Sequence, residues 1–202
     1  MGGTYRPCHP RPVRISVVGS SGSGKTTLAA RLGAALGCEH VELDAINHQP
    51  GWTPREPAAF LREVGERCPV GGAWVVEGNY SHVRPLVWSR ADLVVWLDPP
   101  TWRTMTQLVR RTLVRGALRR ELWNGNRESL RNLLRTDPAE NVVLWSWTRR
   151  HLIRRRYLEA MITPPEPGLR VVRICRPEEA DALVEALARA EAGSGRRPHI
   201  SP

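Results

Sequence analysis

The clearest chemical signal in the sequence is a short glycine-rich segment, residues 19–26, that directly follows a run of β-branched residues. It matches the pattern G-x-x-x-x-G-K-[ST], whose glycines let successive backbone N–H groups face phosphate oxygens. The lysine of this pattern reaches the β- and γ-phosphates of a nucleotide, and the hydroxyl after it binds Mg²⁺. The predicted nucleotide-binding residues are Gly19, Ser20, Ser21, Gly22, Ser23, Gly24, Lys25, Thr26 and Thr27. The segment therefore predicts a site for ATP and Mg²⁺, with Thr26 as a metal ligand.

Lys25 is also the only lysine of the chain, beside 29 arginines. A GTPase guanine motif, N-K-x-D, is therefore excluded. The chain also lacks the L-S-G-G-Q signature of ABC-type ATPases, and its 202 residues are few for the larger ATPase machines. The remaining class is the small kinases, in which a helical lid closes over the phosphate that is transferred.

Acidic and polar residues follow the second and third apolar runs, where ligands bind in parallel sheets. Asp44 is a candidate to accept the proton of an acceptor hydroxyl or to hold a Mg²⁺-bound water, and capping of the following turn is the alternative. Glu77 is a candidate to orient water on Mg²⁺. Gly78 would allow a close backbone approach and Asn79 a hydrogen bond to the acceptor, although a Gly-Asn pair also favours a simple turn.

Three aromatic or imidazole side chains are candidates for the wall of the acceptor pocket: His48, Trp52 and Tyr80. They would line it if the segment 50–52 folds over the acceptor, and Trp52 would then stack on a base. Core packing is an equally open interpretation for each of them.

The net charge of +10 lies entirely in residues 103–156, which hold 14 arginines and four acidic residues. Guanidinium groups stabilise the charge that spreads over a phosphoryl group during transfer. Arg111 and Arg115 share one face of a helix, and Arg127 and Arg131 repeat this spacing after an Asn-Gly break. We therefore expect these four arginines to form a phosphate clamp, with solvated helix faces or nucleic-acid binding as alternatives.

The strands and helices that would position these residues are predicted from short β-branched runs that alternate with helical patterns. The predicted strands are residues 14–18, 41–43, 74–77, 93–97 and 171–174. Helices are predicted at 25–36, 57–68 and 177–191, and 101–161 has a helical pattern with breaks near 124–125 and 137–138. Strands that are separated by helices predict an α/β fold with a five-stranded parallel sheet between helices and an Arg-rich helical lid after the fourth strand.

The chain is expected to form one domain. Residues 1–12 and 191–202 are rich in Gly, Pro, Ser and Arg and are predicted to be disordered, so the P-loop domain spans 13–190, with the lid at about 101–137. The spacing of Cys8, Cys38, Cys68 and Cys175 indicates neither a disulfide framework nor a zinc site. Without an apolar segment for a signal peptide or a membrane span, we expect a cytoplasmic protein.

Four further segments carry a resemblance: L-D-A-I-N-H-Q-P-G-W (43–52), W-V-V-E-G-N-Y (74–80), R-A-D-L-V-V-W-L-D-P-P (90–100) and E-L-W-N-G-N-R-E-S (121–129). With the glycine-rich segment, they resemble the bacterial adenylate-kinase-like family labelled topology modulation protein. The resemblance covers about residues 13–190. It implies the nucleoside-monophosphate-kinase fold with strand order 2-3-1-4-5, ATP binding and a lid. Related kinases place an arginine on the adenine at the position of Gln107, so here Gln107, Arg103 or Arg110 would make that contact.

The leading hypothesis is an ATP-dependent kinase of the nucleoside-monophosphate-kinase type that transfers the γ-phosphate to a nucleotide or small metabolite. Its partners would be ATP and a small anionic acceptor, without a membrane. A phosphate acceptor needs no base, whereas a hydroxyl acceptor would need Asp44. The alternatives are a nucleic-acid-binding P-loop ATPase that affects DNA topology, and a degenerate kinase that only binds ATP. The kinase is favoured because a lid explains the basic excess and because the sequence contains no recognised DNA-reading motif.

Overall fold

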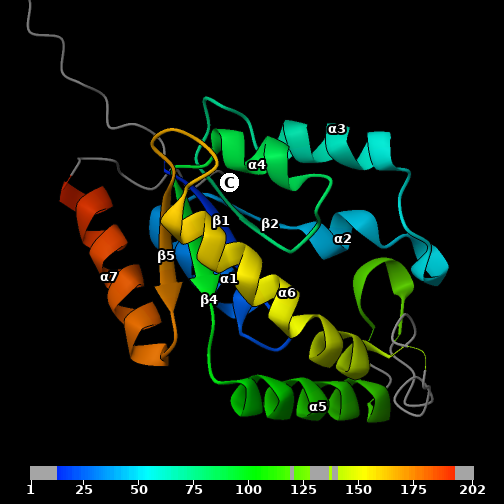
Figure 1. Cartoon of the computed structure of the whole chain (residues 1–202). Helices are drawn as coiled ribbons and strands as arrows, with labels where there is room; N and C mark the ends of the chain where they lie inside the picture. Colours follow the sequence, from blue (N-terminus) through cyan, green and yellow to red (C-terminus); the bar gives the residue numbers. More distant parts are fainter. Residues whose placement is uncertain (1–12, 119–120, 128–136, 138–140, 194–202) are drawn as a thin grey trace, which may run out of the picture.

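A computed structural model describes residues 13–118, 121–127, 137 and 141–193 (Figure 1). Within them, five parallel strands form one sheet in the order β2-β3-β1-β4-β5, as expected from the resemblance. The elements are β1 (Arg14–Gly19), α1 (Lys25–Leu36), β2 (Glu39–Glu42), α2 (Leu43–Asn47), η1 (Pro50–Trp52), α3 (Pro57–Arg67), β3 (Trp74–Glu77), α4 (Arg84–Arg90), β4 (Leu93–Leu97), α5 (Thr101–Ala117), η2 (Trp123–Gly125), α6 (Val142–Ile162), β5 (Arg170–Ile174) and α7 (Pro177–Gly193). The predicted three-layer α/β fold is thus confirmed.

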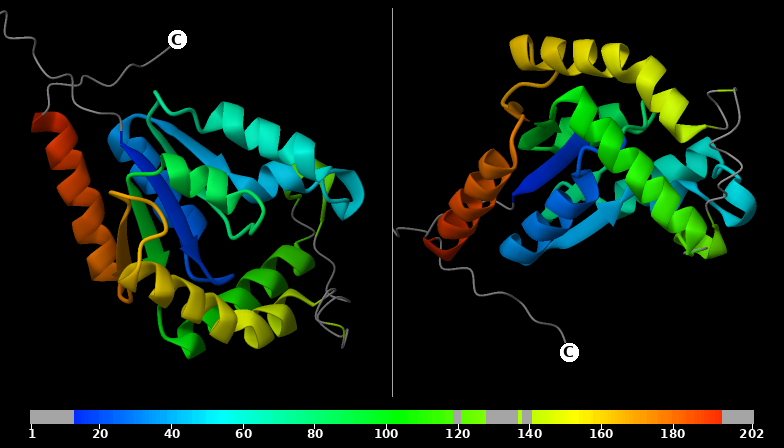
Figure 2. Two further views of the ribbon diagram at one scale, coloured as in Figure 1. Left: turned by 45° about the horizontal axis from the view of Figure 1, so that its top comes forward. Right: turned by 90° about the horizontal axis from the view of Figure 1, so that it is seen from below.

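The sheet separates two apolar cores. On one face α1 packs over β1, β2 and β3, and α7 packs against α1 and β5, with Leu28 and Leu32 of α1 buried. On the other face α3, α4 and α6 pack over Trp74 and Trp96, and α6 contributes Tyr157 to this core. Figures 1 and 2 show α6 crossing one face of the sheet while α1 lies behind it. Because both faces are covered, β1, β3 and β4 consist of buried residues throughout, which explains why their sequences are mostly apolar.

Local sequence explains where several helices begin and end. Gly37 ends α1 in a left-handed conformation (φ 60°), and its N–H bonds to the carbonyl oxygen of Ala34. The Glu56 carboxylate caps α3 by accepting from the N–H groups of Ala58 and Ala59. These caps fix the helices on either side of β2.

Some predicted boundaries are wrong. The second strand begins at Glu39 rather than Val41, because Glu39 and His40 pair with β3, and it ends before Leu43, which starts α2. The last helix continues to Gly193, so residues 191–193 are helical and not part of a disordered tail; Glu191 is half-buried, and nothing before Gly193 breaks the helix. The expected disorder of 1–12 and of 194–202 lies outside the described residues.

The segment after β4 differs from the simple lid that the sequence predicts. α5 is one helix that crosses the nucleotide loop, and α6 returns along the sheet face, so the two helices lie against each other near the carboxyl ends of the strands. The predicted break at Asn124-Gly125 is the short helix η2, where Asn124 has φ 55°. The break at 137–138 falls mostly outside the described residues. No helix in the described part of the chain is long and apolar enough to span a bilayer.

Candidate active site

The glycine-rich loop joins β1 to α1 and has the backbone that phosphate binding requires. Gly22 has φ 83°, and a Cβ there would lie 2.6 Å from the carbonyl oxygen of Thr104, so α5 is in contact with the loop. Gly24 precedes α1 in the left-handed region (φ 96°). The half-buried Lys25 donates from Nζ to the carbonyl oxygen of Ser20 at 3.2 Å. The helix N-terminus and the curled loop together form an anion-binding concavity.

Thr26 and Glu77 lie together at the foot of this loop. Thr26 Oγ1 donates to Glu77 Oε1 at 2.8 Å, and Glu77, at the end of β3, is 2% exposed. Burial raises the pKa of Glu77, while the nearby Lys25 ammonium opposes this shift. Burial in turn lowers the pKa of Lys25. A hydroxyl and a carboxylate in contact fit the oxygen ligands that Mg²⁺ prefers.

The Asn79 side chain is bound to the first residue of the loop. Its Nδ2 donates to the Gly19 carbonyl oxygen at 2.5 Å, and its Oδ1 accepts from the Gly19 N–H at 3.3 Å. Tyr157 of α6 donates a third hydrogen bond to the same Oδ1 at 2.8 Å. The preceding Gly78 has φ 142°, and a Cβ there would meet the Leu43 side chain at 2.8 Å. The Gly-Asn pair thus joins β3 to the loop and to α2, and the amide predicted for the acceptor is engaged within the protein.

Asp44 lies in the first turn of α2, because β2 ends at Glu42, and not at the end of the strand. The predicted alternative was that Asp44 caps this turn, but the N-cap of α2 is Glu42 and Asp44 lies inside the helix. Instead, Tyr80 Oη donates to Asp44 Oδ1 at 2.7 Å. Tyr80 Oη also lies 3.3 Å from His48 Nε2. Since the single phenol hydrogen is directed at Asp44, His48 Nε2–H is the donor in the second bond.

Burial, assisted by the Asp44 carboxylate, raises the pKa of Tyr80. The phenol therefore stays protonated near neutral pH and keeps its hydrogen bond to Asp44. His48, Tyr80 and Asp44 form a connected series on the side of the loop toward β2. The structure brings these three predicted residues together, and their link is a hydrogen-bond series that sequence spacing does not reveal.

A contact that the sequence did not predict covers this series. Residues 121–127 dock onto residues 45–52 through their asparagine side chains. Asn126, 4% exposed, donates from Nδ2 to the Gln49 carbonyl oxygen and accepts from the Trp52 N–H, both at 2.9 Å. Asn124 Nδ2 donates to the His48 carbonyl oxygen at 2.6 Å. The amide-rich W-N-G-N was the available signal, because buried asparagines commonly bind main-chain groups.

Two tryptophans complete the same contact. Trp123 stacks on His48 with 6.0 Å between ring centroids, and its indole N–H donates to Glu42 Oε2 at 2.8 Å. Trp52 meets the edge of His48 at 5.3 Å, and its indole N–H donates to the Arg127 carbonyl oxygen at 3.3 Å. Residues 50–52 therefore lie against His48, held by Asn126 and Arg127, which are 74 and 75 positions later than Trp52 in the sequence.

The predicted arginine clamp is only partly brought together. Arg111 is half-buried and close enough to Lys25 to lower the pKa of that ammonium. Arg115 is half-buried one turn later on α5, whereas Arg127 is exposed and 3.7 Å from Glu121. Arg131 lies outside the described residues. Gln107, at the position of the usual adenine-contacting arginine, is exposed on α5.

Comparison with solved structures gives proteins of similar fold at low sequence identity. A shikimate kinase from Acinetobacter baumannii in complex with shikimate is 17% identical, with a TM-score of 0.50 over 92% of this chain and 96% of that chain. A gluconokinase from Sinorhizobium meliloti 1021 is 20% identical, with a TM-score of 0.48 over 92% of this chain and 99% of that chain. At 17% identity the likeness to the shikimate kinase shows the fold alone. The search of curated proteins returned no match.

Residues 15–157 match the protein family described as AAA domain. The matched region begins in β1 and contains the nucleotide loop, Asp44, Glu77 and most of α6. It agrees with the predicted P-loop kinase-like family, while the finer resemblance to topology modulation protein stays a prediction. This chain therefore belongs to the AAA domain family and has a P-loop kinase-like fold.

Proposed function

We propose that this protein is an ATP- and Mg²⁺-dependent kinase that phosphorylates a hydroxyl group of a small molecule. One observation carries this proposal: the bonded series His48–Tyr80–Asp44 lies beside a loop whose Lys25 and Thr26 suit a nucleotide. The carboxylate is the base that a hydroxyl acceptor needs and a phosphate acceptor does not. Of the types expected from the sequence, the hydroxyl kinase is thus favoured over the nucleoside-monophosphate kinase.

Transfer would proceed by direct attack. Asp44 accepts the proton of the acceptor hydroxyl while the oxygen of that hydroxyl forms a bond to the γ-phosphorus. The bond from that phosphorus to the β,γ-bridging oxygen breaks, and ADP leaves with the electron pair. Lys25 and Arg111 would stabilise the negative charge on the transferred group, because both cations lie at the loop.

Thr26 and Glu77 would hold the metal. Bound Mg²⁺ supplies charge neutralisation at the β- and γ-phosphates. The Thr26 hydroxyl would face the metal directly, and the Glu77 carboxylate would fix the hydroxyl and a metal-bound water. Burial of Glu77 suits this assignment, since a carboxylate with a raised pKa gains most from a nearby cation.

The acceptor would lie between α2, Tyr80 and the docked segment 121–127. His48 Nδ1 is buried and has no hydrogen-bond partner among the described residues, so it offers an acceptor for a substrate hydroxyl. Arg55, whose N–H bonds to the Asn47 carbonyl oxygen, is paired with Glu63 at 2.6 Å. This pairing favours a polar hydroxyl compound over an acceptor that carries a phosphate at this position.

The test is ATP turnover against a panel of sugars, hydroxy acids and nucleoside monophosphates, with Lys25→Ala as the blank. On the best acceptor, Asp44→Asn should lower kcat about a hundredfold or more while ATP affinity stays unchanged. Asp181→Asn is the matched control, because Asp181 pairs with Arg31 on the exposed surface of α7. Full activity of Asp44→Asn, or turnover only with nucleoside monophosphates, would refute the hydroxyl-kinase proposal.

DNA-stimulated ATP hydrolysis is the competing prediction from the sequence, and the fold adds little support for it. Two arginines of the basic segment are paired with acidic residues of the protein: Arg127 with Glu121 at 3.7 Å and Arg155 with Glu159 at 2.8 Å. ATP turnover measured with and without duplex DNA distinguishes the two functions, since only the DNA-dependent ATPase requires stimulation.

A further inference from the structure

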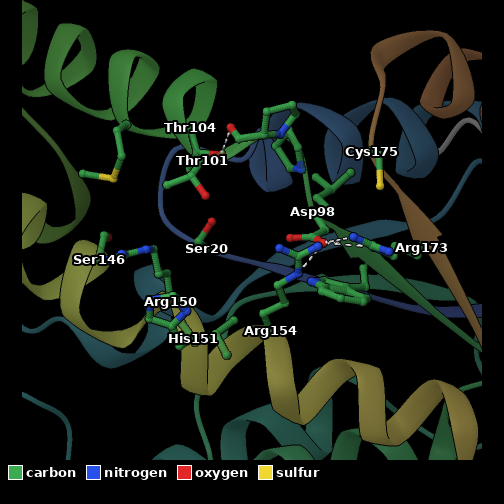
Figure 3. A pocket seen from close by; sticks show the side chains of 16 residues that line it. Ser20, Asp98, Thr101, Thr104, Ser146, Arg150, His151, Arg154, Arg173 and Cys175 are labelled. Atoms are coloured by element: carbon green, nitrogen blue, oxygen red, sulfur yellow. Dashed lines mark hydrogen bonds and ion pairs between the residues drawn. The ribbon is translucent and has the colours of Figure 1, made fainter.

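A cavity of about 270 Å³ lies beside the nucleotide loop, between α5, α6 and the carboxyl ends of β4 and β5 (Figure 3). Ser20 is the only residue of the proposed nucleotide, metal and acceptor sites that lines it. The cavity is on the α6 side of the loop, and the hydrogen-bond series of Asp44 is on the side toward β2. It is therefore separate from the residues proposed to hold the metal and the acceptor.

Positive charge dominates the polar wall of this cavity. Arg150 and Arg154 come from α6 and Arg173 from β5, while Asp98 is the one carboxylate in the lining. Arg173 Nε lies 2.9 Å and Arg154 Nε 3.3 Å from Asp98 Oδ2. A single carboxylate cannot neutralise three guanidinium groups, so the cavity retains a net positive charge that favours an anion.

Ser146 is the second, independent sign of a ligand. Its side chain lines the cavity, the residue is 2% exposed, and Oγ has no hydrogen-bond partner among the described residues. A buried hydroxyl without a partner is unfavourable, and such groups usually bind water or a ligand. Arg150 follows one turn later on the same face of α6, held by stacking on the Trp147 ring. The two side chains lie next to each other in Figure 3.

We propose that this cavity binds a small phosphate-bearing anion. Guanidinium groups match the geometry of phosphate oxygens, and the Ser146 hydroxyl would donate to one more oxygen. Arg150 and Arg154 are the principal ligands, while Arg173 stays with Asp98 and adds charge. The bound anion would also lie near Ser20, whose carbonyl oxygen accepts the hydrogen bond from Lys25.

The experiment must separate this cavity from the nucleotide loop, which is itself a phosphate site. Calorimetric titrations are therefore made on the full chain carrying Lys25→Ala, with inorganic phosphate and with glycerol phosphate as separate probes. The cavity predicts saturable binding of at least one probe in this background. Binding of inorganic phosphate alone would indicate a free-ion site, and tighter binding of the ester would indicate a phosphorylated metabolite.

In the same background, Ser146→Ala and Arg150→Ala should each weaken binding about tenfold or more. Arg155→Ala is the matched control, since Arg155 is exposed on α6 and pairs with Glu159 outside the cavity. Thermal unfolding of each variant verifies its fold, and Ser146→Ala removes only one oxygen. If Lys25→Ala binds neither probe, or if both cavity variants bind as tightly as the control, the proposal is overturned.

Discussion

Replacing Asn79 tests how the fold holds the nucleotide loop. Asn79→Ala removes three hydrogen bonds: two with the main chain of Gly19 and one with Tyr157. At about 1 kcal/mol for each bond, the loss in the free energy of unfolding is about 3 kcal/mol. For a chain of this size, that lowers Tm by about 6–12 °C.

Tyr157→Phe is the matched control, because it removes only the bond from the Tyr157 hydroxyl to Asn79 Oδ1. Burial raises the pKa of Tyr157 to about 12, so this hydroxyl remains a donor throughout the neutral range. The single change should lower the free energy of unfolding by about 1 kcal/mol. In the Asn79→Ala background the same change should have almost no effect, because its partner is already absent.

Urea unfolding gives the free energies of the four proteins in this cycle, and titration with ADP reports the loop itself. Asn79→Ala should weaken ADP binding, since Gly19 begins the nucleotide loop, whereas Tyr157→Phe should leave it nearly unchanged. If Asn79→Ala destabilises the protein no more than Tyr157→Phe does, the amide does not hold Gly19, and the reasoning fails.

Three further predictions concern buried groups. Because the pKa of Glu77 is raised, the contribution of this carboxyl group to stability is present at low pH and is lost as pH rises through its pKa in the folded protein. Glu77→Gln should therefore raise Tm at pH 7, as measured by thermal unfolding from pH 5 to 8, while Mg²⁺-dependent turnover falls. Burial raises the pKa of Cys68 to about 12, so the neutral Cys68 thiol contributes its full stabilisation below about pH 9, the ordinary pKa of a thiol. At pH 8.5, iodoacetamide should therefore modify the half-buried Cys175 much faster than the buried Cys68, as mass spectrometry would show. Asn126→Ala removes the acceptor of the Trp52 N–H, and exchange of that amide should accelerate about tenfold; unchanged exchange would mean that residues 121–127 are not held in this way.

The sequence by itself determined the nucleotide loop and the sheet. G-S-S-G-S-G-K-T has a fixed spacing that a loop between a strand and a helix requires, and Gly19, Gly22 and Gly24 have the positive φ that the pattern predicts. The strands were recognisable because both faces of the sheet are covered, which makes β1, β3 and β4 mostly apolar. Both signals are local, so one stretch of sequence contains them.

Only the tertiary structure decided what the polar residues at this edge of the sheet bind. Asn79 was a candidate for the acceptor, yet its partners are Gly19, 60 residues earlier, and Tyr157, 78 residues later. Asn126 meets Gln49 across 77 residues, and the cavity of Ser146 forms where four separate elements converge. A side chain that is able to make hydrogen bonds has many equivalent partners along the chain, and the choice among them follows from how the helices pack on the sheet.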